Sequence, residues 1–546
     1  MKKNISILLC SLLCYSTFLL AQEKEYWQQE TNYEIEVSLD DEKHELNGFL
    51  RLEYINNSPD DLEEMYFHLW PNAYKNQSTA FAKQKLEAGI TKFYFSKKAE
   101  RGYIDGLNFK GNEKTLTLTY DETHIDICKI ELAETLKSGD TLLITTPFHV
   151  KIPKSFSRLG HVEQSYQITQ WYPKPAVYDA KGWHPMPYLD QGEFYSEYGS
   201  FDVKITLPKN YVVGATGDLQ NQDEQKWLNE KAAETLKITT FEDNTNFPKS
   251  SSEMKTLHYK QQNIHDFAFF ADKRFHVLKG SVQLPNEGKN VTTWAMFTNE
   301  QAKFWKNISI EALNDAVYFY SEKSGTYPYF QATAVQSALS AGAGMEYPNV
   351  TVIGRAGSER SLERVIVHEV GHNWFYGILG SDERTHAWMD EGINTYYENR
   401  YFDEKYPDLK MLGKFAETGI ARFFDVSQYK DNHQSYYMYL FNARKNKDQP
   451  IDLHAHEYTS LNYGGIVYGK AGIAFKYMEA WLGTKRFDKI MQKYYDQFEF
   501  KHPYPDDLKQ LFEQETGKYL DWFFDDLIFT TKKICLLYTS DAADDW

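Results

Sequence analysis

The chain has few cysteines, four among 546 residues. Cys10 and Cys14 lie in an apolar segment at the start of the chain, and only Cys128 and Cys535 follow it. A disulfide framework is therefore excluded as the main support of the fold. A chain of this length can instead bury large hydrophobic cores and is long enough for several domains.

The sequence also lacks an excess of positive charge and, beyond its start, any long apolar run. Its formal net charge of −17 at pH 7 argues against nucleic acid and anionic membrane surfaces as partners. No later stretch is apolar enough to span a membrane. We therefore expect no nucleic-acid partner and no integral membrane segment in the mature chain.

The start of the chain is typical of a secretory signal peptide. Lys2 and Lys3 precede an apolar run from residue 5 to residue 20, and the small residue Ala21 follows. The run is short for a membrane span and contains several hydroxyl side chains, so cleavage after Ala21 or Gln22 is favoured over a retained anchor. We expect an exported protein, periplasmic or extracellular.

The first half of the remaining chain is typical of β-strands. Residues 33–39 alternate apolar and polar, and residues 49–55 repeat the pattern before a turn at 56–59. Further strands are expected at 116–120, 141–145, 201–207 and 211–214. Closely spaced strands with Asn, Asp, Gly and Pro turns predict an antiparallel β sandwich or saddle-shaped sheet.

The second half is mainly helical. Helices are expected at 301–324, 362–376, 390–402, 472–482, 487–498 and 505–515, with strand-like pieces between 335 and 352. The predicted fold class is α+β. The predicted divisions are a signal peptide at 1–22, an N-terminal β domain at 23–255, a mainly helical domain at 256–530, and a tail at 531–546. That tail resembles translated adapter sequence, so we exclude it from the fold.

The most informative stretch contains His368, Glu369 and His372 in an H-E-x-x-H pattern. On a helix, residues four apart share a face, so both imidazoles can bind one metal ion. Glu369 lies to one side, where it can reach a water on the open side of the metal. The pattern thus provides two zinc ligands and a general base. No third histidine follows at the metzincin spacing.

A third zinc ligand is expected from Glu391, which follows His372 after eighteen residues. A connection of this length, with Gly377 and Gly380 in it, can turn back and start a second helix beside the first. Two histidines and one glutamate leave a position for water, as in zinc hydrolases, and predict one Zn²⁺ per chain. The zinc would acidify the water and polarise a carbonyl, and Glu369 would transfer the proton to the leaving group.

Four segments, in this order along the chain, resemble the aminopeptidase N family of gluzincin metallopeptidases, which includes leukotriene hydrolase. Residues 343–347 are similar to its Gly-x-Met-Glu-Asn exopeptidase motif. Residues 368–375 and 390–392 resemble its zinc motifs, whereas thermolysin-type enzymes have a spacer one residue longer. Residues 463–470 are similar to its pair of tyrosines five residues apart. The resemblance covers about residues 30–530.

The resemblance implies a thermolysin-like catalytic domain after the β domain. It also implies that Tyr468 donates a hydrogen bond to the oxyanion of the tetrahedral intermediate. Gly344, Met345, Glu346 and Tyr463 would contact the substrate. In particular, the Glu346 carboxylate would pair with the free α-ammonium group of the substrate. This would place the cleaved bond after the first residue.

The sequence departs from this family at three positions. Ala343 replaces the usual glycine of the exopeptidase motif, and Tyr347 replaces its asparagine. A second amine anchor, a Glu or Gln, is often present where Tyr172 stands here, and Gln170 could replace it only if the loop shifts. These departures weaken the case for strict single-residue cleavage but not for hydrolysis.

We therefore expect a zinc-dependent aminopeptidase that removes N-terminal residues from peptides. A zinc endopeptidase is the nearest alternative, because the second amine anchor is missing. A non-catalytic, peptide-binding member of the family is another, although such a protein would need neither Glu369 nor Tyr468. Epoxide hydrolysis, which the leukotriene branch adds, has no support beyond the shared motifs. The oligomeric state and the preferred side chain do not follow from the sequence.

Overall fold

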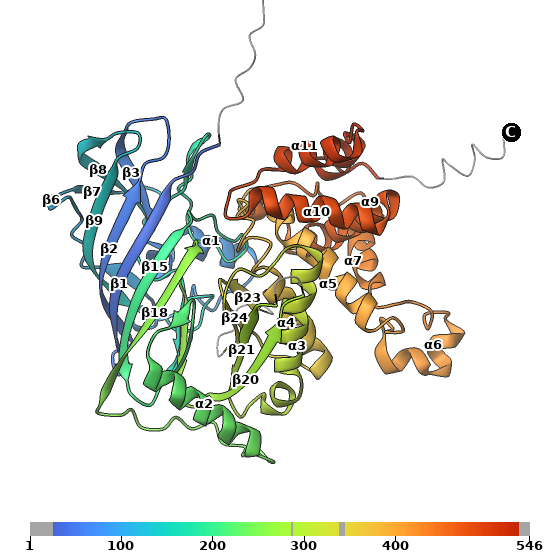
Figure 1. Ribbon diagram of the computed structural model, residues 1–546, viewed down its shortest axis with the longest axis horizontal. Helices are drawn as coiled ribbons and strands as arrows, with labels where there is room; N and C mark the ends of the chain where they lie inside the picture. The colour runs from blue at the N-terminus through green and yellow to red at the C-terminus, as the bar shows by residue number, and fades with distance from the viewer. Residues whose placement is uncertain (1–25, 286–287, 338–343, 534–546) are drawn as a thin grey trace, which may run out of the picture.

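A computed structural model gives the fold of the protein. It describes residues 26–285, 288–337 and 344–533. The predicted signal peptide, Ala343 and most of the predicted tail lie outside the described residues. A β-rich N-terminal region lies beside a region of helices around a smaller sheet (Figure 1). The predicted α+β fold class is thereby confirmed.

The N-terminal region is built on a sheet of nine strands. Its central strands are β1 (Glu30–Asp40), β2 (Glu45–Ile55), β9 (Thr141–Lys151), β15 (Gly199–Pro208) and β18 (Met254–Ile264). Every second residue of β1, from Tyr33 to Leu39, is buried, as the apolar–polar alternation requires. The antiparallel sheet predicted for this region has one exception. β1 and β15 pair in parallel, because a long excursion returns the chain to the free edge of β1.

Smaller sheets complete this region. The large sheet also contains the short strands β4 (Tyr103–Asp105), β5 (Lys110–Gly111), β6 (Lys114–Thr115) and β17 (Asp218–Leu219). Two further sheets contain β3 (Leu62–His68), β7 (Thr117–Tyr120), β8 (Ile127–Leu136) and β12 (Lys174–Pro175), and β10 (Gly160–Val162), β11 (Ser165–Ile168), β16 (Val212–Ala215) and β19 (Phe269–Asp272). A short hairpin joins β13 (Tyr178–Asp179) and β14 (Gly182–Trp183). The predicted boundary at 255/256 falls inside β18, and the N-terminal sheets continue to Asp272.

The second region begins with a mixed sheet of five strands. Their order is β20 (His276–Gln283), β21 (Asn290–Phe297), β22 (Gln331–Gln336), β24 (Val350–Ile353) and β23 (Gly344–Tyr347). Helices α3 (Ala302–Lys323) and α4 (Glu359–Gly371) pack against this sheet and against each other. β23 is an edge strand, so one side of it is free to face the site described below.

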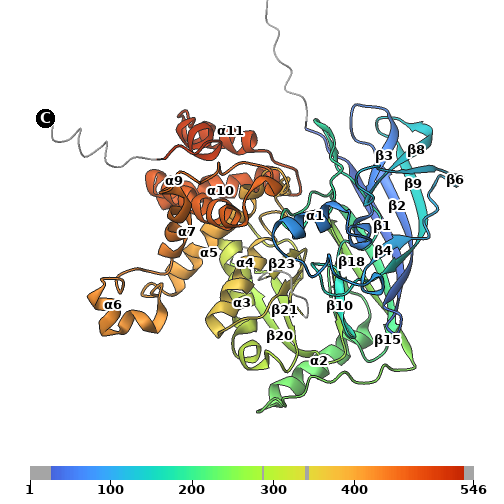
Figure 2. The same ribbon diagram turned by 180° about the vertical axis from the view of Figure 1, so that it is seen from behind.

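The remaining helices fill the second region. They are α5 (Glu391–Lys405), α6 (Gly419–Phe423), α7 (His433–Ala443), α8 (Ser460–Asn462), the π-helix η6 (Tyr463–Lys470), α9 (Ala471–Leu482), α10 (Thr484–Phe498) and α11 (Pro505–Thr516). In the N-terminal region, α1 (Ala80–Glu87) lies on the side that faces the second region, and α2 (Gln222–Lys237) lies at the lower edge. α6 projects away from the body of the second region (Figure 2). Within the described residues, no helix combines the length and apolar character needed to cross a membrane.

The helix that carries the H-E-x-x-H pattern is shorter than predicted. α4 ends at Gly371, not at residue 376. The chain turns tightly after it, with Tyr376 at a positive φ of 84° and the Gly377 N–H bonded to the His372 carbonyl at 2.8 Å. A Cβ on Gly377 would lie 2.6 Å from the carbonyl oxygen of Asn373, so the turn requires glycine there.

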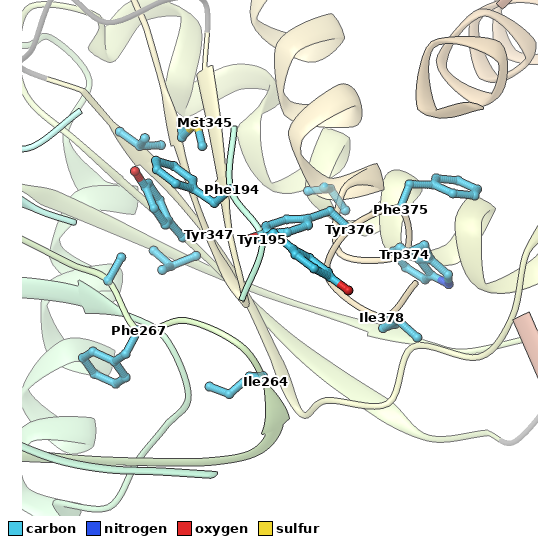
Figure 3. Close-up of a cluster of buried hydrophobic side chains, with 14 of the residues drawn as sticks. Phe194, Tyr195, Ile264, Phe267, Met345, Tyr347, Trp374, Phe375, Tyr376 and Ile378 are labelled. Atoms are coloured by element: carbon cyan, nitrogen blue, oxygen red, sulfur yellow. The ribbon is translucent and has the colours of Figure 1, made fainter. Parts of the chain in front are cut away.

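One hydrophobic core contains side chains from both regions. Figure 3 shows part of it, with Phe194 and Tyr195 from the N-terminal region among Met345, Tyr347 and Tyr376 from the second. The shared core gives the N-terminal region a fixed position against the H-E-x-x-H helix.

Candidate metal centre and active site

His368 and His372 lie one turn apart on the last turn of α4 and its C-cap, and each is held by a carboxylate from α5 or its start. The Nδ1–H of His368 donates to Glu398 at 3.0 Å, and that of His372 donates to Asp390 at 2.5 Å. With Nδ1 engaged in each ring, Nε2 is the nitrogen through which each histidine would bind a cation.

Three donor atoms converge at this point. His368 Nε2 and His372 Nε2 are 3.1 Å apart, and Glu391 Oε2 lies 3.2 and 3.3 Å from them. Ligand atoms about 2.0–2.1 Å from a tetrahedral zinc are separated by roughly 3.3 Å, so the set fits the ion. Glu346, His372 and Asp390 also converge. The second set also uses His372, whose Nδ1 is already hydrogen-bonded to Asp390. We therefore place the metal ion among His368, His372 and Glu391.

The electrostatics of the three donors also favour a cation. Burial lowers the pKa of His368, but its hydrogen bonds to Glu391 and Glu398 outweigh burial and raise the pKa to about 10. Burial likewise lowers the pKa of His372, and the charges of Glu346 and Glu391 raise it to about 10. The carboxylates thus stabilise positive charge at this position.

Glu369 is buried beside the donor set and under strand β23. A Cβ on Gly344 would lie 2.3 Å from its Oε1, so only glycine lets the strand pass this close. Its Oε2 is buried with no hydrogen-bond partner among the described residues. Burial raises the pKa of Glu369 to about 7, against the opposing charges of His368 and His372. A carboxylate with such a pKa can both accept and return a proton near neutral pH.

Glu346 lies on the same edge strand, two residues beyond Gly344. Its side chain is buried, and its Oε1 has no partner within the described residues. Burial, with the charges of Glu193, Glu369 and Glu391, holds the pKa of Glu346 well above its usual range despite His372. A buried carboxylate without a partner is costly unless a cation comes to it.

Tyr463 and Tyr468 lie on the π-helix η6, whose i to i+5 hydrogen bonds bring residues five apart onto one face. Their rings are 5.8 Å apart. The Tyr468 hydroxyl donates to Glu391 Oε1, and its ring stacks on His368 with centroids 6.0 Å apart. The Tyr463 hydroxyl is buried and without a partner among the described residues. Both therefore face the donor set.

Met345 lies against the N-terminal region, where the second amine anchor would also be expected. The Nε–H of Arg158 donates to the Met345 sulfur at 3.2 Å, and Arg158 pairs with Glu193 at 2.5 Å. This buried pair was not predicted from the sequence, because no motif marks it. Gln170 is not available to the site, because its amide bonds Tyr347 at 3.0 Å within the core.

The roles of Asp390 and Glu398 were also not predicted from the sequence. Glu398 is seven residues after Glu391, which places both on one face of α5. This spacing could have identified Glu398 as the partner of a zinc-binding histidine. Asp390 gave no comparable signal, since its orientation depends on the turn before α5.

Comparison with known proteins also indicates a peptidase. Residues 319–527 match the Peptidase family M1 domain. Aminopeptidase M1-C of Oryza sativa subsp. japonica is 22% identical over 282 residues, which are 48% of this chain and 29% of that protein. Alanine/arginine aminopeptidase of Saccharomyces cerevisiae is 21% identical over 159 residues, 30% of this chain and 17% of that protein. The chain thus matches less than a third of the length of either relative.

Solved structures extend the fold similarity over nearly the whole chain. An M1 zinc metallopeptidase from Deinococcus radiodurans has a TM-score of 0.59 at 13% identity, covering 93% of this chain and 95% of that one. A mutant of that metallopeptidase, bound to a Tyr-Ser-Ala substrate, has a TM-score of 0.60 at 13% identity, covering 93% and 96%. At this identity the similarity establishes the fold.

Together the fold and the candidate donor set define the class: the architecture is that of solved M1 zinc metallopeptidases, and the three convergent donors fit a zinc ion. Within that class, residues 319–527 match the Peptidase family M1 domain. The resemblance drawn from the sequence is confirmed.

Proposed function

We propose that this chain is a zinc-dependent aminopeptidase that removes N-terminal residues from peptides, with one zinc per chain. The observation that carries the proposal is the convergence of His368, His372 and Glu391 beside two buried carboxylates, Glu369 and Glu346, each with an oxygen that lacks a partner in the described chain. One carboxylate suits proton transfer and the other suits a cationic substrate group.

A zinc ion held by the three donors supplies a Lewis acid that polarises the scissile carbonyl and acidifies water. Glu369 accepts the proton of the attacking water and delivers it to the leaving amine. The Tyr468 hydroxyl, already directed at the donor set, donates to the oxyanion as the tetrahedral centre forms.

Glu346 gives the reaction its exopeptidase character in this proposal. Its carboxylate pairs with the α-ammonium group of the substrate, which relieves the cost of a buried, unpaired carboxylate. Gly344 and Met345 on the same strand and Tyr463 on η6 line the approach to it. Arg158 and Glu193 close the opposite side from the N-terminal region.

The Glu346→Gln variant tests this assignment. Loss of one charge-assisted contact lowers kcat/KM for free-amine peptides by about 10- to 100-fold. N-acetylated peptides, which carry no ammonium group, should be cleaved by neither form. Glu363→Gln is the matched control, because Glu363 is equally buried but pairs with Arg360 and Lys405. Unchanged kcat/KM in Glu346→Gln would remove the ammonium-binding role.

The alternatives make different predictions. A zinc endopeptidase would cleave acetylated peptides, and a non-catalytic peptide-binding protein would bind zinc and peptide without turnover. We also propose that the protein is exported to the periplasm or the medium, supported by the signal-like start of the sequence.

A further inference from the structure

Arg364 is a half-buried arginine of α4 that the proposed reaction does not use. It lies four residues before His368, which places the two side chains on one face of the helix. The Nη1–H group of Arg364 donates to Oε1 of Glu398, while Oε2 of Glu398 accepts the Nδ1–H of His368 at 3.0 Å. A single carboxylate from α5 therefore bridges two residues of α4, and one of them is a candidate zinc ligand.

Two further contacts fix the guanidinium group of Arg364. Its Nη2–H group donates to Oδ2 of Asp431, which lies in the loop before α7. Its central carbon lies 4.0 Å from the centre of the Phe402 ring, so α5 also supports its face. Arginine presents its donors in a rigid planar fork, which lets one side chain bond two carboxylates at once. The guanidinium thus has a single well-defined position against Glu398.

The segment that follows Asp431 also supports the tyrosines of the site. A Cβ on Gly465 of η6 would lie 3.1 Å from the carbonyl oxygen of Met438, so the backbones of η6 and α7 pack closely together. η6 carries Tyr468, which faces the metal donors. Arg364 therefore connects this pair of helices to the carboxylate that holds a zinc-binding histidine.

We propose that Arg364 is a positioning residue of the metal centre. It holds Glu398 against His368 and, through Asp431, links the position of that ligand to α7 and η6. Loss of a partner that orients a histidine ligand typically weakens metal binding about 10- to 100-fold. Arg364 lies one hydrogen bond further from the metal, so we expect a loss at the lower end of this range. The inference rests on the zinc site of the proposed function.

The direction of the change in zinc affinity separates positioning from charge. Arg364 is a cation near the place of another cation, so its charge alone opposes zinc binding. In Arg364→Met, loss of that charge by itself would lower the zinc Kd, whereas loss of the bond to Glu398 should raise it about tenfold. Arg364→Lys keeps the charge and a donor for Glu398, so its zinc Kd should stay within about threefold of wild type.

The zinc Kd is measured by competition with a chromophoric chelator, with the melting temperature as a check on folding. Arg360→Met is the matched control. Arg360 also lies on α4 and stacks on an aromatic ring, that of Tyr406, but it pairs with Glu363. Its loss should leave the zinc Kd unchanged. An unchanged or lower zinc Kd in Arg364→Met would overturn the proposal.

A double variant tests whether Arg364 acts through Glu398. In Glu398→Gln the carboxylate is already absent, so adding Arg364→Met should change the zinc Kd by less than about threefold. This comparison also serves if Arg364→Met alone does not fold, because the double variant leaves one fewer carboxylate unpaired. A larger further loss would show that Arg364 acts by another route and would overturn the proposal. Wild-type protein that binds no zinc would instead refute the proposed function, and this inference with it.

Discussion

The buried carboxylates around the candidate metal centre outnumber the positively charged side chains that pair with them in the described chain. Glu193 pairs with Arg158, whereas Glu346 and Glu369 each keep an oxygen without a partner in the described chain. Such groups destabilise a fold unless a cation binds. A zinc ion and a substrate ammonium group together would supply the missing positive charge. These carboxylates thus lower the stability of the fold and favour binding, which is typical of functional residues.

The Glu369→Gln variant separates chemistry from metal binding at the scale of a single residue. Glutamine keeps the size but cannot accept the proton, so kcat should fall by about 10²- to 10⁴-fold. Zinc content should remain one per chain, because Glu369 is not among the convergent donors. Kinetics and metal analysis of the same preparation check both parts. Full activity, or loss of zinc, would contradict the role of Glu369 as the base.

At the scale of elements, the site depends on the close crossing of α4 and α5. A Cβ on Gly371 would lie 2.0 Å from Asn394 Oδ1 and 2.3 Å from the Tyr320 hydroxyl. Tyr320 donates to Asn394 at 2.8 Å, and Asn394 donates to the carbonyl of His368 at 2.8 Å. Gly371 therefore lets α5 bring Glu391 to the two histidines.

We expect Gly371→Ala to force these helices apart. Overpacking at a buried crossing costs about 1–3 kcal/mol of unfolding free energy, and the displaced Glu391 should weaken zinc binding as well. Urea denaturation and chelator competition measure the two effects. Gly357→Ala is the control, because its Cβ would meet no atom within 4 Å. Equal stability and zinc affinity in the two variants would show that the crossing tolerates a methyl group.

The sequence predicted the presence of these helices better than the residues at which they end or the elements that they contact. The i, i+4 spacing identified the two histidines, and the eighteen-residue spacer identified Glu391 at the start of α5. The spacing of Tyr463 and Tyr468 was predicted only through the family resemblance, since a π-helix has no periodicity that distinguishes it in advance. The end of α4 was misplaced because the turn depends on a left-handed Tyr376 and on Gly377.

At the scale of the whole molecule, the N-terminal region supplies side chains that local patterns could not reveal. Arg158 and Glu193 approach the site from loops that follow the β-strands. Their position depends on how two sheets pack, which is set by long-range contacts. The strand segments were predictable from alternation, but the parallel pairing of β1 with β15 was not, because it depends on chain topology.

The junction of the two regions contains a buried, hydrogen-bonded histidine. His502 donates from Nδ1 to the Gly380 carbonyl at 2.7 Å and pairs through Nε2 with Glu197 of the N-terminal region at 3.1 Å. Burial lowers the pKa of His502, but Glu197 outweighs it and raises the pKa above 6.5. The charged form thus links the two regions.

We expect this link to make stability depend on pH. A raised folded pKa stabilises the fold fully below the unfolded pKa, and the contribution is lost as pH rises through the folded value. The unfolding free energy of wild type should exceed that of His502→Gln by more at pH values below the folded pKa of His502 than at pH values above it. Urea denaturation at pH values on both sides of that pKa measures this difference. A difference that does not change with pH would mean that His502 acts by packing alone.

We propose that the chain cleaves peptides one residue at a time from a free amino end, using zinc. The most direct measurement is hydrolysis of a panel of aminoacyl-aminomethylcoumarins beside their N-acetylated forms, with and without a zinc chelator. A zinc aminopeptidase should cleave the free-amine set alone, and this cleavage should be abolished by the chelator and restored by added zinc. Cleavage of the acetylated set would contradict the exopeptidase assignment, and zinc-loaded protein that cleaves neither set would contradict the enzymatic one.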